Sequence, residues 1–180
     1  MGTRSDRGTG ARAAAALLNV AGIPIYETPI LAEWIDYNGH LRDAYYGLIV
    51  SFASDALMDR VGLDAAYRAR SGCTLYTLEM HLHYLREVLR SDTVAVTVRI
   101  EGADRKRIHA TFEMQRSGDP AVAASAEVLL LHVHQTSDRV AAAPFPPQVS
   151  AALDELQAAS AALAAEAPGS RRMGLRPPTP

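Results

Sequence analysis

The chain has 180 residues, 48% of them hydrophobic, with a formal net charge of −2 and a pI near 6.3. This length is enough for one domain with a sizeable core, and the lack of a basic surplus argues against nucleic acid or an anionic membrane as the partner. A small molecule or another protein therefore remains as the partner. The single cysteine, Cys73, excludes an internal disulfide and a cysteine-based metal cluster, so we expect a cytoplasmic protein.

Both ends of the chain have compositions that predict little structure. Residues 1–20 are rich in Gly, Ala, Arg and Ser, and we interpret them as a mobile leader. The alanine run in this leader is short and is followed by Asn19, which argues against a signal peptide. Residues 167–180 carry several arginines and prolines and predict a disordered tail. Between these ends we expect one domain over residues 21–145 and a C-terminal helix over residues 146–166.

The domain is predicted to begin with a strand and a long helix. Residues 23–34 alternate loosely between apolar and polar, and Pro24 and Pro29 confine them to an edge strand. Apolar residues then recur at helical spacing as far as Val61, with Asp43 in front of them as an N-cap. Because few polar residues interrupt the pattern, we expect this helix to be largely enclosed.

A short helix over residues 65–70, capped by Asp64, separates the long helix from a long strand over residues 74–88. Period-two alternation predicts that one face of this strand is apolar, formed by Tyr76, Leu78, Met80, Leu82 and Tyr84. Three further strands follow after turn sequences, over residues 94–100, 107–115 and 121–134. Short loops between them predict an antiparallel meander.

These elements predict an α+β domain in which an antiparallel sheet of about five strands curls around the long helix. A sheet of this kind leaves one edge open. We therefore expect two copies of the chain to pair and complete the core, and both a dimer and a dimer of dimers stay open.

A polar loop lies where the first strand meets the long helix. It reads Trp34-Ile-Asp-Tyr-Asn-Gly-His-Leu-Arg-Asp43 and brings two carboxylates, an amide and an imidazole into one short stretch. Loops that a rigid scaffold holds at both ends often carry chemistry. The same residue types also suit turns and a helix cap, so the pattern by itself leaves a purely structural role open.

Several segments, in order, resemble the hot-dog-fold acyl-CoA thioesterases of the 4-hydroxybenzoyl-CoA thioesterase type. They are Trp34-x-Asp36-x-Asn38-Gly39-His40, Asp43-x-Tyr45-Tyr46, Tyr84-x-Arg86-Glu87 and Ser91-Asp92. Two more, Thr77-x-Glu79-x-His81 and Leu130-Leu-His-Val133, resemble the betainyl-CoA thioesterase branch, which is linked to carnitine breakdown. The resemblance implies hydrolysis of betainyl-CoA to glycine betaine and CoA, with no cofactor other than the coenzyme A of the substrate.

The resemblance also implies a role for each part of the polar loop. Asp36 occupies the position of the carboxylate that attacks the thioester or activates water, and a positioned base contributes on the order of 10²–10⁴-fold. Asn38 and His40 would orient the substrate or the water, while N–H groups at the helix start would polarise the carbonyl. The family usually has asparagines where this chain has Arg42 and Asp43. His40 could also pair with Asp43.

The acyl group that the resemblance implies carries a trimethylammonium group, which has no hydrogen-bond donor and is recognised by aromatic faces and carboxylates. We therefore expect substrate-binding residues around the loop and, second to them, on the long strand: Trp34, Tyr37, Tyr45, Tyr46, Glu79 and His81. The candidates for the CoA phosphates are basic: Arg86, Lys106 and Arg107. The pairs His81/His83 and His132/His134 lack an evident third ligand, so no metal site is expected.

Two other functions stay open on this fold. A hot-dog domain that binds acyl-CoA without cleaving it would act as a sensor or a dimerisation module, and the presence of Asp36 argues against it. The second is hydratase chemistry, which would require a different arrangement of aspartate and histidine from the one in this sequence.

Overall fold

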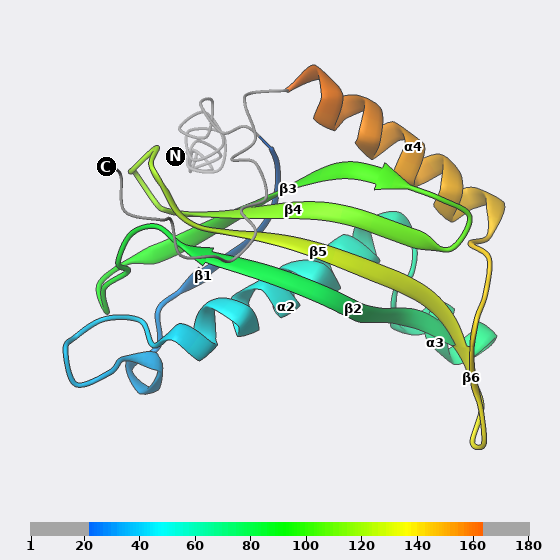
Figure 1. Cartoon of the computed structure of the whole chain (residues 1–180), viewed down its shortest axis with the longest axis horizontal. Coiled ribbons are helices and arrows are strands. Elements are labelled where there is room, and N and C mark those ends of the chain that lie inside the picture. Colours follow the sequence, from blue (N-terminus) through cyan, green and yellow to red (C-terminus); the bar gives the residue numbers. More distant parts are fainter. Residues whose placement is uncertain (1–21, 164–180) are drawn as a thin grey trace, which may run out of the picture.

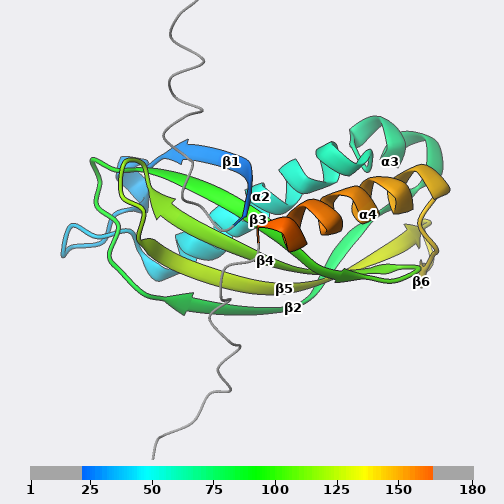
Figure 2. The same ribbon diagram turned by 90° about the horizontal axis from the view of Figure 1, so that it is seen from above.

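The structure, a computed structural model, describes residues 22–163; the predicted leader, the tail and the end of the predicted C-terminal helix lie outside them. One antiparallel sheet carries a long helix on one face and a second helix along one edge (Figure 1, Figure 2). Its strands are β1 (Ile23–Pro29), β2 (Cys73–Tyr84), β3 (Thr93–Ala103), β4 (Arg107–Arg116), β5 (Val122–Gln135) and β6 (Val140–Ala142). The sheet order is β1-β3-β4-β5-β2, with β6 paired to β5, and this confirms the predicted α+β antiparallel fold.

The first strand ends earlier than its sequence predicted. β1 pairs with β3 from Ile23 to Pro29, and the Ile30 N–H still donates to the Asp92 carbonyl at 3.1 Å. The chain then turns into the 3-10 helix η1 (Ala32–Trp34). The prediction of a strand that reaches Trp34 was therefore wrong, and the polar loop begins from a short helix instead.

The long helix α2 (Asp43–Val61) packs one side on the sheet. Its buried residues recur at helical spacing: Tyr46, Ile49, Val50, Ala53, Leu57 and Val61. Gly62 ends the helix with a φ of 83°, a left-handed conformation that glycine adopts without strain. On the other side Ser51, Asp55 and Asp59 are exposed. The sheet thus covers α2 on one side, and the helix is less enclosed than its composition indicated.

The edge strand β2 contains a bulge that the alternation of its sequence did not reveal. Its register against β5 shifts between Thr77 and Glu79, which inserts Leu78 as one extra residue. One extra residue reverses which side chains face the core. Accordingly Met80 packs against the core after the bulge, whereas Tyr76 and Leu78 are 37% and 53% exposed. The prediction of one apolar face from Tyr76 to Tyr84 was therefore wrong for its first half.

The two remaining helices finish the ends of the sheet. In α3 (Ala65–Ser71), the Asp64 carboxylate accepts a hydrogen bond from the Tyr67 N–H at 2.7 Å, which confirms the predicted cap. In α4 (Pro147–Ala162), Val149, Leu153 and Leu156 are buried, and the helix lies along β3. Because β1 pairs with β3 only from Thr93 to Val98, α4 covers the part of the β3 edge that β1 leaves open.

The meander of β3, β4 and β5 has the register that short hairpins impose. Val96, Phe112 and Val128 point from three different strands into the core, where each is at most 1% exposed.

Within residues 22–163, no helix is long and apolar enough to cross a membrane.

Candidate active site

The polar loop is a tight turn that is tied to the sheet. The Asp36 N–H donates to the His40 carbonyl at 2.9 Å, and the Gly39 N–H donates to the Asp36 carbonyl at 3.1 Å. Gly39 has a φ of 86°, which favours glycine at this position. Isolated bridges join Ile35 to Leu41 and His40 to Leu89. The loop is therefore fixed both to itself and to the segment that follows β2.

The carboxylate of Asp36 is held by the backbone of its own loop. Its Oδ1 accepts the N–H groups of His40 and Asn38 at 3.0 and 2.8 Å, and Asn38 Nδ2 lies 3.5 Å from Oδ2. The His40 N–H, and then that of Asn38, lower the pKa of Asp36 below its ordinary value, because both bonds favour the ionised form. Asp36 is thus a fixed, ionised carboxylate at neutral pH.

The side chain of His40 pairs with Glu87. His40 Nε2 lies 2.5 Å from Glu87 Oε2, and Glu87 belongs to the segment just after β2. The open alternative, a pair between His40 and Asp43, is therefore not the one that forms.

Asp43 lies one position further along than its predicted role requires. Arg42 occupies the capping position, with φ −64° and ψ 140°, and Asp43 is the first residue of α2. The Asp43 Oδ1 accepts the Ala44 N–H at 2.8 Å. The prediction of Asp43 as the N-cap was wrong by one residue, but its carboxylate still pairs with an N–H of the first turn and faces the positive end of the helix dipole.

A cavity of about 490 Å³ opens beside this loop. Its walls come from the loop, the start of α2 and the segment after β2: Asp36, His40, Leu41, Arg42, Asp43, Tyr46, Tyr84, Leu85, Arg86 and Glu87. The rings of Tyr46 and Tyr84 meet edge to face, with centroids 5.2 Å apart and planes at 90°. The carboxylate of Asp36, the first turn of α2 and the rings of Tyr46 and Tyr84 therefore all border this cavity.

Of the four aromatic residues predicted around the loop, Tyr46 alone lines this cavity. Trp34 is 7% exposed, and its ring stacks on Tyr45 with a centroid separation of 5.5 Å. Tyr37 is 96% exposed. The structure therefore does not gather the four rings around one space, and substrate contacts by Trp34, Tyr37 and Tyr45 stay predictions.

Tyr84 and Glu87 are the site residues that sequence reasoning missed as such. Both belong to the segment Tyr84-x-Arg86-Glu87, which contributed to the family resemblance without receiving a role. Their position next to the loop depends on the pairing of distant segments, which the local pattern does not encode.

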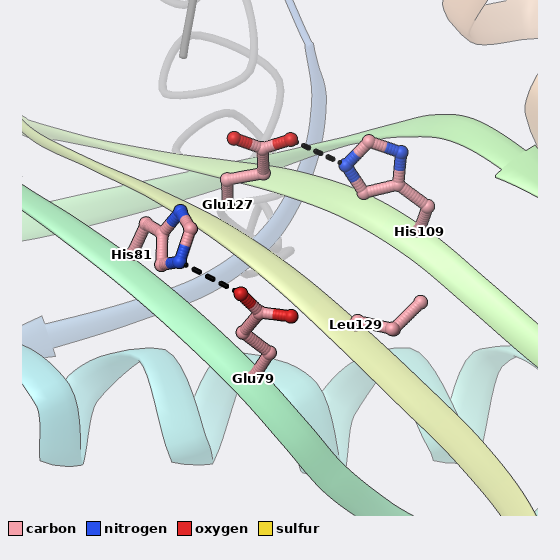
Figure 3. Close-up of a pocket in the computed structure, with 5 residues that line it drawn as sticks. All are labelled: Glu79, His81, His109, Glu127 and Leu129. Carbon is pink, nitrogen blue, oxygen red and sulfur yellow. Dashed lines mark hydrogen bonds and ion pairs between the residues drawn. The ribbon is translucent and has the colours of Figure 1, made fainter. Parts of the chain in front are cut away.

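Glu79 and His81 lie on a different face of the sheet, opposite α2 (Figure 3). His81 Nε2 is 2.9 Å from Glu79 Oε1, and on the neighbouring strands His109 Nε2 is 2.7 Å from Glu127 Oε1. Together with Leu129 these residues line a second cavity of about 320 Å³. Within this chain Glu79 and His81 are not brought to Asp36, and their contact with the substrate stays a prediction.

The three basic candidates for CoA are also separated. Arg86 lines the cavity beside Asp36. Lys106 and Arg107 belong to the β3–β4 hairpin, at the other end of the sheet from the loop (Figure 1). There the Lys106 N–H, followed by the Arg107 guanidinium, lowers the pKa of Asp104 to about 2. Arg107 therefore has a partner in its own hairpin, and phosphate contacts by Lys106 and Arg107 stay predictions.

In the part of the chain that the structure describes, no three His, Cys, Asp or Glu residues are arranged to hold a metal ion. His132 is instead buried, with Nε2 3.0 Å from the Tyr67 hydroxyl and Nδ1 2.9 Å from the Ala143 carbonyl oxygen. Its ring is thus used in a structural hydrogen-bond chain.

The sequence is similar to proteins of known family. Residues 30–153 match a family described as the thioesterase-like superfamily. A betainyl-CoA thioesterase from Pseudomonas aeruginosa is 45% identical over 152 residues, which cover 84% of this chain and 94% of that protein. An L-carnitine dehydrogenase/betainyl-CoA thioesterase from Agrobacterium fabrum is 37% identical over 134 residues, which cover 74% of this chain and 27% of that protein.

Solved structures have the same fold. A proposed thioesterase from Pseudomonas putida KT2440 superposes with a TM-score of 0.74 at 40% identity, over 87% of this chain and 98% of that one. A Staphylococcus aureus protein in complex with CoA superposes with a TM-score of 0.69 at 28% identity, over 76% of this chain and 85% of that one. These neighbours confirm the hot-dog arrangement that the resemblance implied.

Proposed function

This chain belongs to the thioesterase-like superfamily, and from that premise we propose that it hydrolyses betainyl-CoA to glycine betaine and coenzyme A. The observation that carries the proposal is the ionised Asp36 at a cavity with both aromatic and acidic walls. The choice of acyl group is supported by the 45% identity to the Pseudomonas aeruginosa betainyl-CoA thioesterase.

Hydrolysis breaks the bond between the acyl carbon and sulfur and adds the oxygen of water to that carbon. In one route the Asp36 carboxylate attacks the acyl carbon, the CoA thiolate leaves and takes up a proton, and water then hydrolyses the mixed anhydride. In the other route Asp36 takes a proton from water as the water attacks the acyl carbon, and the CoA thiolate then leaves and takes up that proton. Both routes need the ionised form of Asp36, which its lowered pKa provides.

The thioester oxygen gains negative charge in either route. The first turn of α2 directs main-chain N–H groups and the positive end of the helix dipole toward the loop that holds Asp36. A preorganised donor at a developing oxyanion is worth about 3 kcal/mol. We therefore propose that the carbonyl oxygen points toward this turn while the acyl carbon faces Asp36.

We further propose that the working form is a homodimer that pairs through β2. β2 ends the strand order, and the apolar side chains of Leu78 and Leu85, on and just after it, are 53% and 52% exposed. An apolar edge strand invites pairing unless it is covered, and a second copy covers it by a self-complementary contact. Light scattering is expected to give twice 19.4 kDa, and Leu78→Arg should reduce that mass. A wild-type mass of one chain at working concentrations would refute the dimer.

The decisive test of the function is the release of free thiol from a panel of acyl-CoA thioesters, betainyl-CoA among them. Wild type is expected to cleave betainyl-CoA, and Asp36→Asn to lose about 10²-fold or more of kcat. Asp138→Asn, which changes an exposed aspartate outside the site, is the matched control. No release from any thioester would favour a non-catalytic acyl-CoA-binding domain, and unchanged release by Asp36→Asn would remove this carboxylate from the mechanism.

A further inference from the structure

We propose that Tyr84, supported by Tyr46 and Glu87, forms the subsite that holds the trimethylammonium group of the acyl chain. This inference rests on the proposed function and assigns residues to its substrate specificity. It differs from the expectation that Trp34, Tyr37, Tyr45 and Tyr46 bind this group together, since Tyr46 lines the cavity beside Asp36 and the other three do not.

The covalent structure of the acyl group limits where its subsite can lie. Nitrogen and the acyl carbon are joined through a single methylene, so they are about 2.5 Å apart. The groups that contact the trimethylammonium must therefore border the same space as the carboxylate that reacts. Tyr46 and Tyr84 meet this condition, because they line one cavity together with Asp36.

The two rings offer the shape that a rounded cation needs. Because their planes are at 90°, they form a corner at which a methyl-covered ammonium can contact both rings. Tyr46 is 4% exposed and forms the base, whereas Tyr84, at the end of β2, is 54% exposed in the single chain, and both rings line the cavity. The Tyr84 hydroxyl donates to the Asp43 carbonyl at 3.3 Å, which fixes the ring against the start of α2.

The charges around the cavity complement a cation more than an anion. Its walls contain three carboxylates, those of Asp36, Asp43 and Glu87, two guanidinium groups, and the imidazole of His40, which pairs with Glu87. One of the two guanidinium groups, that of Arg42, donates to the Ile35 carbonyl at 3.2 Å, which holds it beside the loop. A quaternary ammonium cannot donate a hydrogen bond, so attraction by aromatic rings and carboxylates is the means left to recognise it.

The experiment compares two substrates of the same shape and different charge. Betainyl-CoA carries a quaternary nitrogen where 3,3-dimethylbutyryl-CoA carries a quaternary carbon, so the ratio of their kcat/KM values measures recognition of the charge. The variants are Tyr84→Leu, which removes the ring, and Tyr84→Phe, which keeps it. Tyr76→Leu makes the same change at another exposed tyrosine of the same strand and is the matched control, with its mass checked by light scattering because the proposed dimer pairs through β2.

Wild type is expected to prefer betainyl-CoA, and Tyr84→Leu to lower the preference about 5- to 30-fold, a change of about 1–2 kcal/mol at 1.4 kcal/mol per tenfold. Tyr84→Phe and Tyr76→Leu should keep the preference within about twofold, because the ring of residue 84 stays in both. Glu87→Gln should also lower the preference, since it removes a carboxylate while keeping the size of the side chain.

The outcomes separate the subsite from the function on which it rests. If wild type cleaves neither substrate, both the proposed function and the subsite are wrong. If wild type prefers betainyl-CoA and Tyr84→Leu keeps that preference, the function stands and the subsite is wrong. An equal loss on both substrates would show that Tyr84 has only a structural role, and this too would overturn the subsite.

Discussion

The imidazole of His40 lies against the carboxylate of Glu87, with Nε2 and Oε2 2.5 Å apart. The backbone N–H of the same His40 donates to the Asp36 carboxylate at 3.0 Å. Glu87 therefore contacts the side chain of His40, and the backbone N–H of His40 binds the carboxylate of Asp36. Although Glu87 lies far along the chain, it is placed to position Asp36, which we propose as the reacting carboxylate.

Replacement of Glu87 should show this positioning role in kcat. We expect Glu87→Ala to lower kcat about tenfold or more, because small displacements of a reacting group are costly. Glu87→Gln should recover most of the loss, since its amide oxygen can still accept a hydrogen bond from the imidazole. The assay uses 3,3-dimethylbutyryl-CoA, whose acyl group carries no charge, so that recognition of a cationic acyl group does not contribute to the result. An equal loss in the Ala and Gln variants would contradict the positioning role.

The hydrogen bonds to Asp36 also predict the acid limit of activity. They lower its pKa, so the ionised form persists as the pH falls and is lost only below the ordinary aspartate value of about 3.9. We expect kcat/KM to decline on the acid side below that value, as measured with a thiol reagent that reacts at low pH. Activity after return to pH 7 controls for unfolding. An acid limb near pH 6 would show that another group controls the reaction.

The parts of the fold that local patterns encode were predicted well. Helical spacing and the terminal glycine marked α2, with its end at Gly62, and the cap at Asp64 marked α3. The bulge at Leu78 was missed, because an inserted residue changes which face is buried without changing the alternation of the sequence. The contact between His40 and Glu87 was missed for a related reason, since it depends on the pairing of segments that are distant in the sequence.

The buried hydrogen-bond chain through His132 predicts a stability loss. The Ala143 carbonyl can only accept, so Nδ1 of His132 carries the hydrogen and Nε2 accepts from the Tyr67 hydroxyl. Burial raises the pKa of Tyr67, which keeps this hydroxyl protonated. Tyr67→Phe leaves Nε2 unpaired in the core and should lower the free energy of unfolding by about 1–3 kcal/mol. Urea denaturation measures this loss.

The control for this change is Tyr76→Phe, which removes a hydroxyl from a ring that is 37% exposed. Its free energy of unfolding should change by no more than about 0.5 kcal/mol. A comparable loss in both variants would mean that the hydrogen bond to His132 is not the cause.

The contact between α4 and the edge of β3 predicts a second, local effect. Ser160 is 1% exposed; its Oγ accepts the Ile100 N–H at 3.0 Å and donates to the Leu156 carbonyl at 2.8 Å. Ser160→Ala leaves a buried N–H without a partner, which costs about 1–3 kcal/mol. Ser51→Ala, on the exposed side of α2, is the matched control. Besides the loss in urea, we expect faster hydrogen exchange at the Ile100 amide, because its protection depends on α4. Unchanged exchange at Ile100, with the global loss still present, would show that other contacts hold α4 on this edge.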